Sequence, residues 1–383
     1  MVDTAPAASA EERDAWLALV LAGGAIASRQ MLLTLHGSAA AALSAGPAAW
    51  LAAGCDDAQR AALAQPPSGP LRHARRWLEA AGHHFIGWDH PAYPPLLRES
   101  PQPPLALFVA GEPALLAHPG VAIVGSRRPS AGGRDHAGVF AEALAQAGLA
   151  VVSGLAAGID AAAHEAALGH AAGLTLAILG TGPDVPYPAR HAALQARMAR
   201  EGAVASEYPP GTPARAGQFP SRNRIVAGLT LGTLVVEAAH RSGALITARL
   251  AGEAGREVFA IPGSIHNPMA RGCHRLIRDG ATLVESADDV LAVLGPLAAS
   301  RIAPLRGTPA APIEVAGRDT GRPPLPANPD YQRLWQALGH DPIPMDSLVQ
   351  RTGLTAAALS SMLLAMELEG RVVVRHGRYM RYP

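Results

Sequence analysis

Short aliphatic runs alternate with alanine-rich amphipathic stretches through the middle of this chain, and this alternation restricts the fold more than any other feature. The aliphatic runs are VAIVG from residue 121, AVVS from 150, LTLAIL from 174, TLVVE from 233 and VFAI from 258. Runs of this length predict buried strands, and the stretches between them predict helices. We therefore expect βαβ units and an α/β fold whose mostly parallel sheet is covered on both faces.

The sequence on either side of this region divides into further parts. Residues 1–82 are rich in Ala and Leu with helical spacing, which predicts a helical domain of the SAM or helix-hairpin-helix type. The prolines of FIGWDHPAYPPLLRESPQPPLALFVAG, residues 85–111, argue against a long helix or a central strand and predict an extended connection. A domain boundary near residues 83 to 105 follows, so the α/β domain is assigned to residues 83–295. Residues 296–327 have little periodicity and predict a linker. Residues 328–383 contain three helical segments and a hairpin, as in a winged helix.

Composition restricts the location and the partners of the protein only partly. The chain has no lysine, so all 32 basic residues are arginines, and the net charge is +1. Charge neither predicts nor excludes a polyanionic partner, although arginine suits bidentate phosphate contacts. Two cysteines, Cys55 and Cys273, indicate a reducing compartment and no metal cluster. The acidic N-terminus and the absence of a long apolar run predict a soluble cytoplasmic protein without membrane contact.

The first predicted strand of the series ends in a loop that could bind an anion. Gly125, Ser126, Arg127 and Arg128 follow the strand and precede a helix. A glycine at this point lets the backbone approach a ligand, and free N–H groups at a helix start favour negative charge. The alternative is that both arginines are simply solvated loop residues.

The next two strand ends carry similar loops. Gly154 follows the second strand, and the helix after it carries Asp160 and His164 on one face. The third strand leads into a loop rich in Gly and Pro that carries Arg190 and His191. Three successive strand ends thus present loops to one crevice, which is where ligands bind in open α/β sheets. Asp160 and His164 could equally be a capping carboxylate and a partly buried imidazole.

A later segment, SEYPPGTPARAGQFPSRNRIVAGLT, concentrates basic and aromatic residues. Phe219, Arg222, Asn223 and Arg224 lie within six positions of one another. Such residues suit phosphate contacts, hydrogen bonds to base edges and stacking on an unpaired base. The other interpretation is a helix start whose arginines pair with Glu207 or Glu237.

The ordered set of motifs resembles the DprA/Smf family over residues 85 to 290. These motifs are GSRRPS, VVSGLAAGIDAAAH, LGTGPDVPYP, SEYPPG, FPSRNRIVAGL, VVEA, SGALITA and GREVFAIPG, in that order. The resemblance implies an extended Rossmann-like domain that binds and protects incoming single-stranded DNA and loads the RecA recombinase during natural transformation. It also implies a homodimer, no cofactor, and a DNA-contacting loop at 125–128 with a second basic strip at 222–224.

The candidate DNA-binding residues, from the loops and from the resemblance, are Gly125, Ser126, Arg127, Arg128, Gly154, Arg190, Phe219, Arg222, Asn223, Arg224, Ser242 and Thr247. The family commonly has an asparagine where this chain has His191. No catalytic residue and no metal ligand is expected.

Two other functions compete with DNA binding. The first is hydrolysis of a nucleotide or nucleoside monophosphate on a related fold, with Asp160, His164 or Glu237 as acid or base. The second is a scaffold role for the helical and winged-helix parts. The third helix of the winged helix has no arginine and ends near Glu367 and Glu369. This pattern favours a protein contact or a weak contact of the wing with DNA over sequence-specific reading of a duplex.

Overall fold

The computed structural model describes residues 9–169, 174–306, 328–338, 342–375 and 377–381. The chain divides into two compact units, residues 1–315 and 316–383. Each unit has a hydrophobic core of its own.

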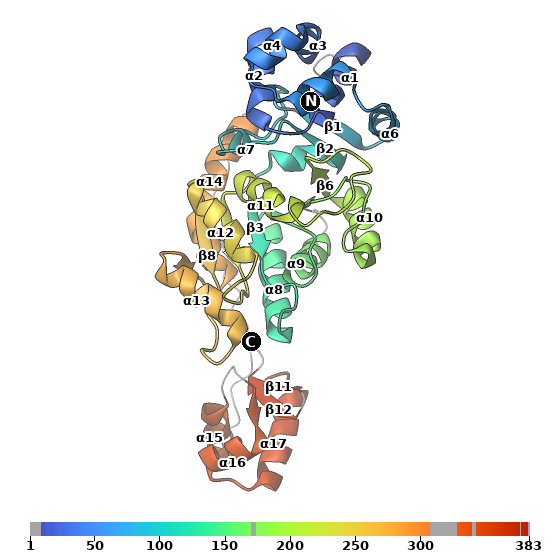
Figure 1. The fold of residues 1–383 in the computed structure, drawn as a ribbon. Helices are drawn as coiled ribbons and strands as arrows, with labels where there is room; N and C mark the ends of the chain where they lie inside the picture. Colours follow the sequence, from blue (N-terminus) through green and yellow to red (C-terminus); the bar gives the residue numbers. More distant parts are fainter. Residues whose placement is uncertain (1–8, 170–173, 307–327, 339–341, 376, 382–383) are drawn as a thin grey trace. The chain divides into compact units, whose positions relative to one another are not determined.

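In the described part of the first unit, nine strands form one sheet in the order β1-β2-β6-β5-β4-β3-β7-β8-β9. The N-terminal helices, blue in Figure 1, lie beside β1 and β2. All neighbouring strands from β6 to β9 are parallel, while β2 pairs antiparallel with both β1 and β6. The strands are β1 His83–Gly87, β2 Ala106–Gly111, β3 Gly120–Val124, β4 Ala150–Ser153, β5 Thr175–Ile178, β6 Ala203–Ser206, β7 Gly232–Val235, β8 Glu257–Ala260 and β9 Thr282–Leu283. The five strands predicted from the aliphatic runs are β3, β4, β5, β7 and β8, so the α/β fold with a mostly parallel sheet is confirmed.

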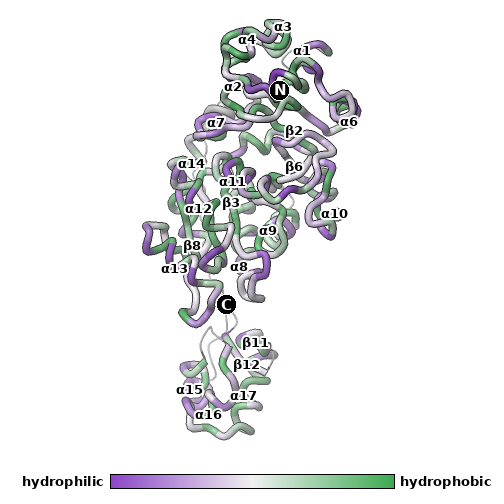
Figure 2. The backbone as a smooth tube through the Cα atoms, in the orientation of Figure 1, coloured by the Kyte–Doolittle hydropathy of each residue, from purple (hydrophilic) through white to green (hydrophobic). Residues whose placement is uncertain are grey.

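Helices cover both faces of the sheet because successive side chains of a strand point to opposite faces. On β3, Val121 and Ile123 pack with α8, α9 and α14, whereas Ala122 and Val124 pack with α11 and α12. Hydrophobic residues accordingly dominate the middle of the sheet (Figure 2). The helices of this layer are α7 Pro95–Arg98, α8 Ala131–Gln146, α9 Ile159–Leu168, α10 Ala192–Glu201, α11 Gln218–Leu229, α12 Ala244–Glu253, α13 Arg271–Arg278 and α14 Ala287–Arg306.

The expectation of an extended connection over residues 85–111 was wrong at both ends, which belong to strands β1 and β2 of the sheet. Residues His83–Gly87 form the edge strand β1, which pairs with β2. The prolines of this segment all lie between β1 and β2, where they do not interrupt the sheet hydrogen bonds. Strand β2 is itself buried, with Leu107, Phe108 and Val109 fully inaccessible to solvent.

The predicted linker also begins too early. Helix α14 continues through residues 296–306, which were assigned to the linker. Val290, Leu291, Leu294 and Ala298 recur at helical spacing and pack against the core, and this burial outweighs the Gly and Pro content that suggested irregular structure. The rest of the predicted linker, residues 307–327, lies outside the described residues.

The N-terminal helices pack on the antiparallel edge of the sheet. They are α1 Ala10–Leu21, α2 Ile26–His36, α3 Ala39–Ser44, α4 Gly46–Ala52, α5 Asp57–Ala64 and α6 Ser68–Leu78. Their core contains Trp16, Leu17 and Trp50 and extends to Phe108 on β2. Within the ranges described, no helix is long and apolar enough to cross a membrane.

The second unit is a winged helix, as predicted. Its elements are α15 Pro329–Ala337, β10 Ile343–Pro344, α16 Met345–Thr352, α17 Ala356–Leu368, β11 Val372–Arg375 and β12 Arg378–Arg381. The strands pair in the order β10-β12-β11. Leu334, Leu348, Leu359 and Leu363 form the centre of its core.

Candidate functional site

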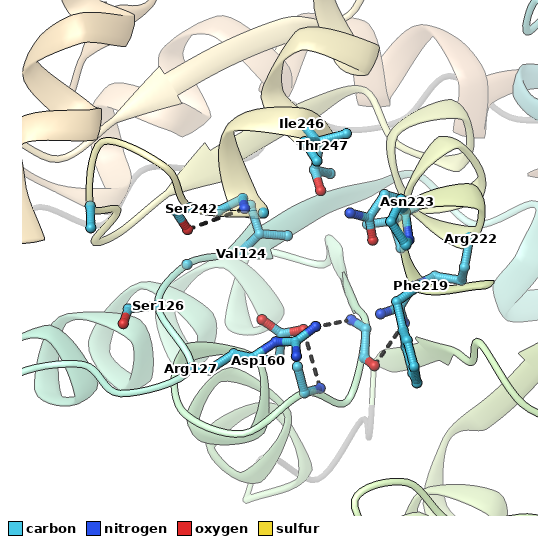
Figure 3. A pocket seen from close by; sticks show the side chains of 18 of the residues that line it. Val124, Ser126, Arg127, Asp160, Phe219, Arg222, Asn223, Ser242, Ile246 and Thr247 are labelled. Atoms are coloured by element: carbon cyan, nitrogen blue, oxygen red, sulfur yellow. Dashed lines mark hydrogen bonds between the residues drawn. The ribbon is translucent and has the colours of Figure 1, made fainter. Parts of the chain in front are cut away.

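A pocket of about 350 Å³ opens at the carboxyl ends of β3, β4 and β7 (Figure 3). Within the sheet, β4, β5 and β6 are added in turn on one side of β3, and the chain then returns to place β7 on the other side of β3. The pocket therefore lies where the strand order reverses. This is the usual ligand position in a doubly wound sheet. Among the predicted residues, the pocket is lined by Gly125, Ser126, Arg127, Gly154, Phe219, Arg222, Asn223, Ser242 and Thr247.

Gly125 in the loop after β3 and Gly158 in the loop after β4 allow neighbouring loops to pack closely against each other. A Cβ on Gly125 would lie 2.6 Å from the Ile159 side chain and 2.9 Å from the Glu237 carbonyl oxygen. Gly158 has a φ of 92°, and a Cβ there would lie 2.3 Å from the Ser126 carbonyl oxygen. These glycines therefore allow close approach between the loops that follow β3, β4 and β7. Gly125 also lines the pocket, and its contact with a ligand stays a prediction.

Arg127 and two aromatic rings form one rim of the pocket. Arg127 is exposed, and its Cζ lies 5.9 Å from the centre of the Phe219 ring. The Phe219 ring lies 4.8 Å from that of Tyr187, which is 43% exposed. Gly180 makes room for this arrangement, because a Cβ there would approach Phe219 to 2.9 Å. We call Arg127, Tyr187 and Phe219 the aromatic rim; Arg127 and Phe219 line the pocket, and Tyr187 packs beside Phe219. A cation beside a half-buried ring and an exposed one suits a phosphate next to a stacked base.

Arg222 is buried and holds the backbone beneath the pocket. Its Nη1 donates hydrogen bonds to the carbonyl oxygens of Gly154, at 2.7 Å, and Ile178. Asp160 lies close by and accepts hydrogen bonds from the N–H groups of Gly154 and Ala156, at 3.1 and 3.3 Å. Burial raises the pKa of Asp160, and the Arg222 charge opposes that rise. Burial lowers the pKa of Arg222 to about 10. Arg222 is thus first a structural cation.

Three predicted residues lie away from the pocket lining. The Arg224 guanidinium pairs with the Glu207 carboxylate, and both side chains are nearly buried. This is the ion pair that the sequence left open as the alternative to a DNA contact. Arg128 and Arg190 are exposed and do not line the pocket.

Arg241 is an exposed arginine that also lines the pocket, and it was not among the predicted residues. It directly precedes Ser242, whose Oγ accepts a hydrogen bond from the Ala244 N–H at 3.3 Å at the start of α12. The signal was present in the sequence HRSG, a basic residue between a buried strand and a helix start. Arg127 and Arg241 belong to the loops after β3 and β7, so cations from both sides of the strand reversal line a pocket that also contains a helix N-terminus.

The residues considered as acid or base catalysts already make hydrogen bonds within the protein. The Glu237 carboxylate accepts hydrogen bonds from the Ser130 N–H and Oγ, at 2.9 and 2.6 Å, and so holds the start of α8. His164 is fully buried, with Nδ1 2.7 Å from the Thr175 Oγ1. Neither residue lines the pocket. Asp160 lines it, but its carboxylate accepts from two backbone N–H groups, so the geometry gives no support to the hydrolase hypothesis.

His164 is expected to make stability depend on pH. Burial lowers its pKa to about 3, well below the ordinary value of 6.5. Between these values the unfolded chain binds a proton that the folded chain does not, so stability should fall as pH drops from about 6.5 toward 3. His164→Asn should flatten this dependence, and urea unfolding of both proteins between pH 7.5 and 4.5 measures it. An equally steep loss in the variant would assign the acid sensitivity to other groups.

Comparisons with known proteins agree with the fold. Residues 84–295 match the family model described as DNA recombination-mediator protein A, and residues 318–378 match the DprA winged helix domain. The chain is 41% identical to Protein Smf of Escherichia coli (strain K12) over 317 residues, 82% of each protein. It is 49% identical to DNA processing protein DprA of Streptococcus pneumoniae over 200 residues, 52% of this chain and 70% of that protein.

A solved structure supports the same assignment. The X-ray structure of DprA from Streptococcus pneumoniae superimposes with a TM-score of 0.63 at 37% sequence identity. The match covers 72% of this chain and 95% of that one.

Proposed function

This chain belongs to the DNA recombination-mediator protein A family, and on that premise we propose that it binds single-stranded DNA at the pocket beside β3 and β7. The observation that carries the proposal is the aromatic rim. It places the exposed guanidinium of Arg127 beside the Phe219 ring at the mouth of a pocket that Arg241 and the α12 N-terminus also line.

The arrangement suits an unpaired strand better than a duplex. Arg127 and Arg241 would hold phosphates, and the α12 N-terminus would favour the same negative charge. Tyr187 and Phe219 offer ring faces on which unpaired bases can stack, whereas bases in a duplex are already stacked on one another. Asn223 and Thr247 line the pocket and could hydrogen-bond to a base or sugar.

The biological role that we propose is protection of incoming single strands and their transfer to the RecA recombinase during natural transformation, by a homodimer. Its support is the family resemblance. We also propose that residues 1–82 act as a separate helical domain, although their core is continuous with β2. No chemical step is assigned to the pocket.

For the winged helix we propose a protein contact. Helix α17 has no arginine and exposes Leu364 and Leu368, one turn apart, at 58% and 81%. In the wing, the Arg371 Nε donates to the Glu369 carboxylate at 2.7 Å, and Arg381 stacks on the Trp335 ring at 4.4 Å. Arginines engaged in this way, beside an apolar helix face, favour a protein partner over duplex DNA.

The proposal is tested by titrating the protein into fluorescent oligonucleotides, single-stranded and duplex, at several salt concentrations. We expect tighter binding of the single strand. The slope of log affinity against log salt should be about −1.4 or steeper, because each phosphate contact contributes about −0.7. Equal affinity for single-stranded and duplex oligonucleotides, or an affinity that does not change with salt concentration, would overturn the proposal.

A further inference from the structure

Helix α6 of the N-terminal helices has one buried face and one strongly basic face. Ala74 is fully buried, and Leu71, Trp77 and Leu78 pack against the same core. The opposite face carries Arg72 and Arg76, four residues apart and therefore one turn apart, with His73 beside them. Both arginines are exposed, and neither guanidinium has a hydrogen bond or an ion pair among the described residues.

His73 of the same helix contacts the loops that follow β5 and β6. The His73 Nε2 lies 2.7 Å from the Asp184 Oδ2, and the Asp184 Oδ1 accepts a hydrogen bond from the Gly211 N–H at 2.7 Å. The His73 ring lies directly over Gly211, where a Cβ would come within 3.1 Å of it. One histidine of α6 thus contacts two loops that follow β5 and β6.

These two loops carry residues of the proposed DNA site and further free cations. Tyr187 of the aromatic rim lies three residues after Asp184, and Arg190 lies three residues beyond it. Arg215 lies four residues after Gly211 and precedes Phe219 by four. Arg190 and Arg215 are exposed, and their guanidinium groups have no hydrogen bond or ion pair among the described residues.

We propose that the Arg72 and Arg76 face of α6 is a second binding surface for the sugar-phosphate backbone of a single strand that leaves the pocket past the aromatic rim. The inference rests on the proposed function and extends it. Two observations support it. The two arginines are exposed and unpaired among the described residues, and His73 joins α6 to the loop that bears Tyr187 and to the loop that leads into α11 and Phe219. The chain as a whole is nearly neutral, with a net charge of +1, so arginines without an acidic partner create a local positive potential that the overall charge does not provide.

The experiment compares two oligonucleotide lengths on the full chain carrying Arg72→Ala with Arg76→Ala. A strand of about 4 nucleotides would occupy the pocket alone, whereas one of about 30 nucleotides would also reach α6. We expect unchanged affinity for the short strand and about tenfold weaker binding of the long one. The salt slope for the long strand should become less steep by about 1.4, for two lost phosphate contacts.

The matched control is Arg13→Ala with Arg75→Ala, which removes the same charge from the same group of helices. Arg75 is on α6 but pairs with Asp14, and Arg13 is on α1. This control should bind both strands as the unaltered protein does. If both double variants lose the same affinity for the long strand, overall charge explains the effect and the inference is overturned. Unchanged affinity for the long strand in the α6 variant would also overturn it. If the unaltered protein binds neither strand, the proposed function itself fails.

Discussion

Arg127→Ala should weaken binding of single-stranded DNA about thirtyfold, which corresponds to about 2 kcal/mol. The lost interaction is a charge-assisted hydrogen bond to a phosphate, together with the cation that lies over the Phe219 ring at 5.9 Å. The salt slope should become less steep by about 0.7, the contribution of one phosphate. Fluorescence anisotropy at several salt concentrations gives both quantities from the same titrations.

The control for this variant is Arg200→Ala, which removes an exposed arginine that pairs with Glu201 on α10. It should leave affinity and salt slope unchanged. Arg127 is exposed and makes no side-chain hydrogen bond among the described residues, so its removal should not alter stability. If Arg127→Ala binds single strands as tightly as the unaltered protein, the aromatic rim is not the DNA site.

The position of the site could be predicted from the sequence because it depends on topology. Parallel strands place their carboxyl ends at one edge of the sheet, so the residues that follow β3, β4 and β7 had to meet there. Gly125 and Gly154 were placed correctly on that basis, whereas the loop after β5, which was expected at the same crevice, contributes no residue to the pocket lining. Strand β2 and the end of α14 were missed because prolines and glycines were weighed more heavily than the burial of the apolar residues near them.

The roles of the individual arginines could not be predicted in this way. Arg222 and Arg224 lie two positions apart in the sequence, yet one holds the carbonyl oxygens of Gly154 and Ile178 and the other pairs with Glu207. Their partners come from distant strand ends, and local spacing contains no information about such contacts. The free charge of Arg127 is likewise a result of tertiary structure. No acidic side chain among the described residues pairs with its exposed guanidinium, which leaves the charge available for a ligand.

Arg222→Met should lower the free energy of unfolding by about 3 kcal/mol, because it leaves a buried carboxylate and two carbonyl oxygens without their cation. This loss of unfolding free energy should become larger as the pH rises. Burial already raises the pKa of Asp160, and loss of the Arg222 charge raises it further. Above the unfolded value near 3.8 the folded variant must then keep a proton that the unfolded chain has released, so its stability falls as pH rises.

Urea unfolding at pH 4.5 and 7.5 measures this difference. Because the Arg222 charge also lowers the pKa of His164, both Arg222→Met and its reference protein carry His164→Asn, which removes that second contribution. Adding Asp160→Asn to Arg222→Met should remove the pH dependence of the deficit, since the carboxylate is gone. A deficit that is the same at both pH values would show that the lost carbonyl contacts, rather than the Asp160 charge, dominate. A variant as stable as the unaltered protein would mean that Arg222 is not structural, and its guanidinium would then be available to DNA as the sequence first suggested.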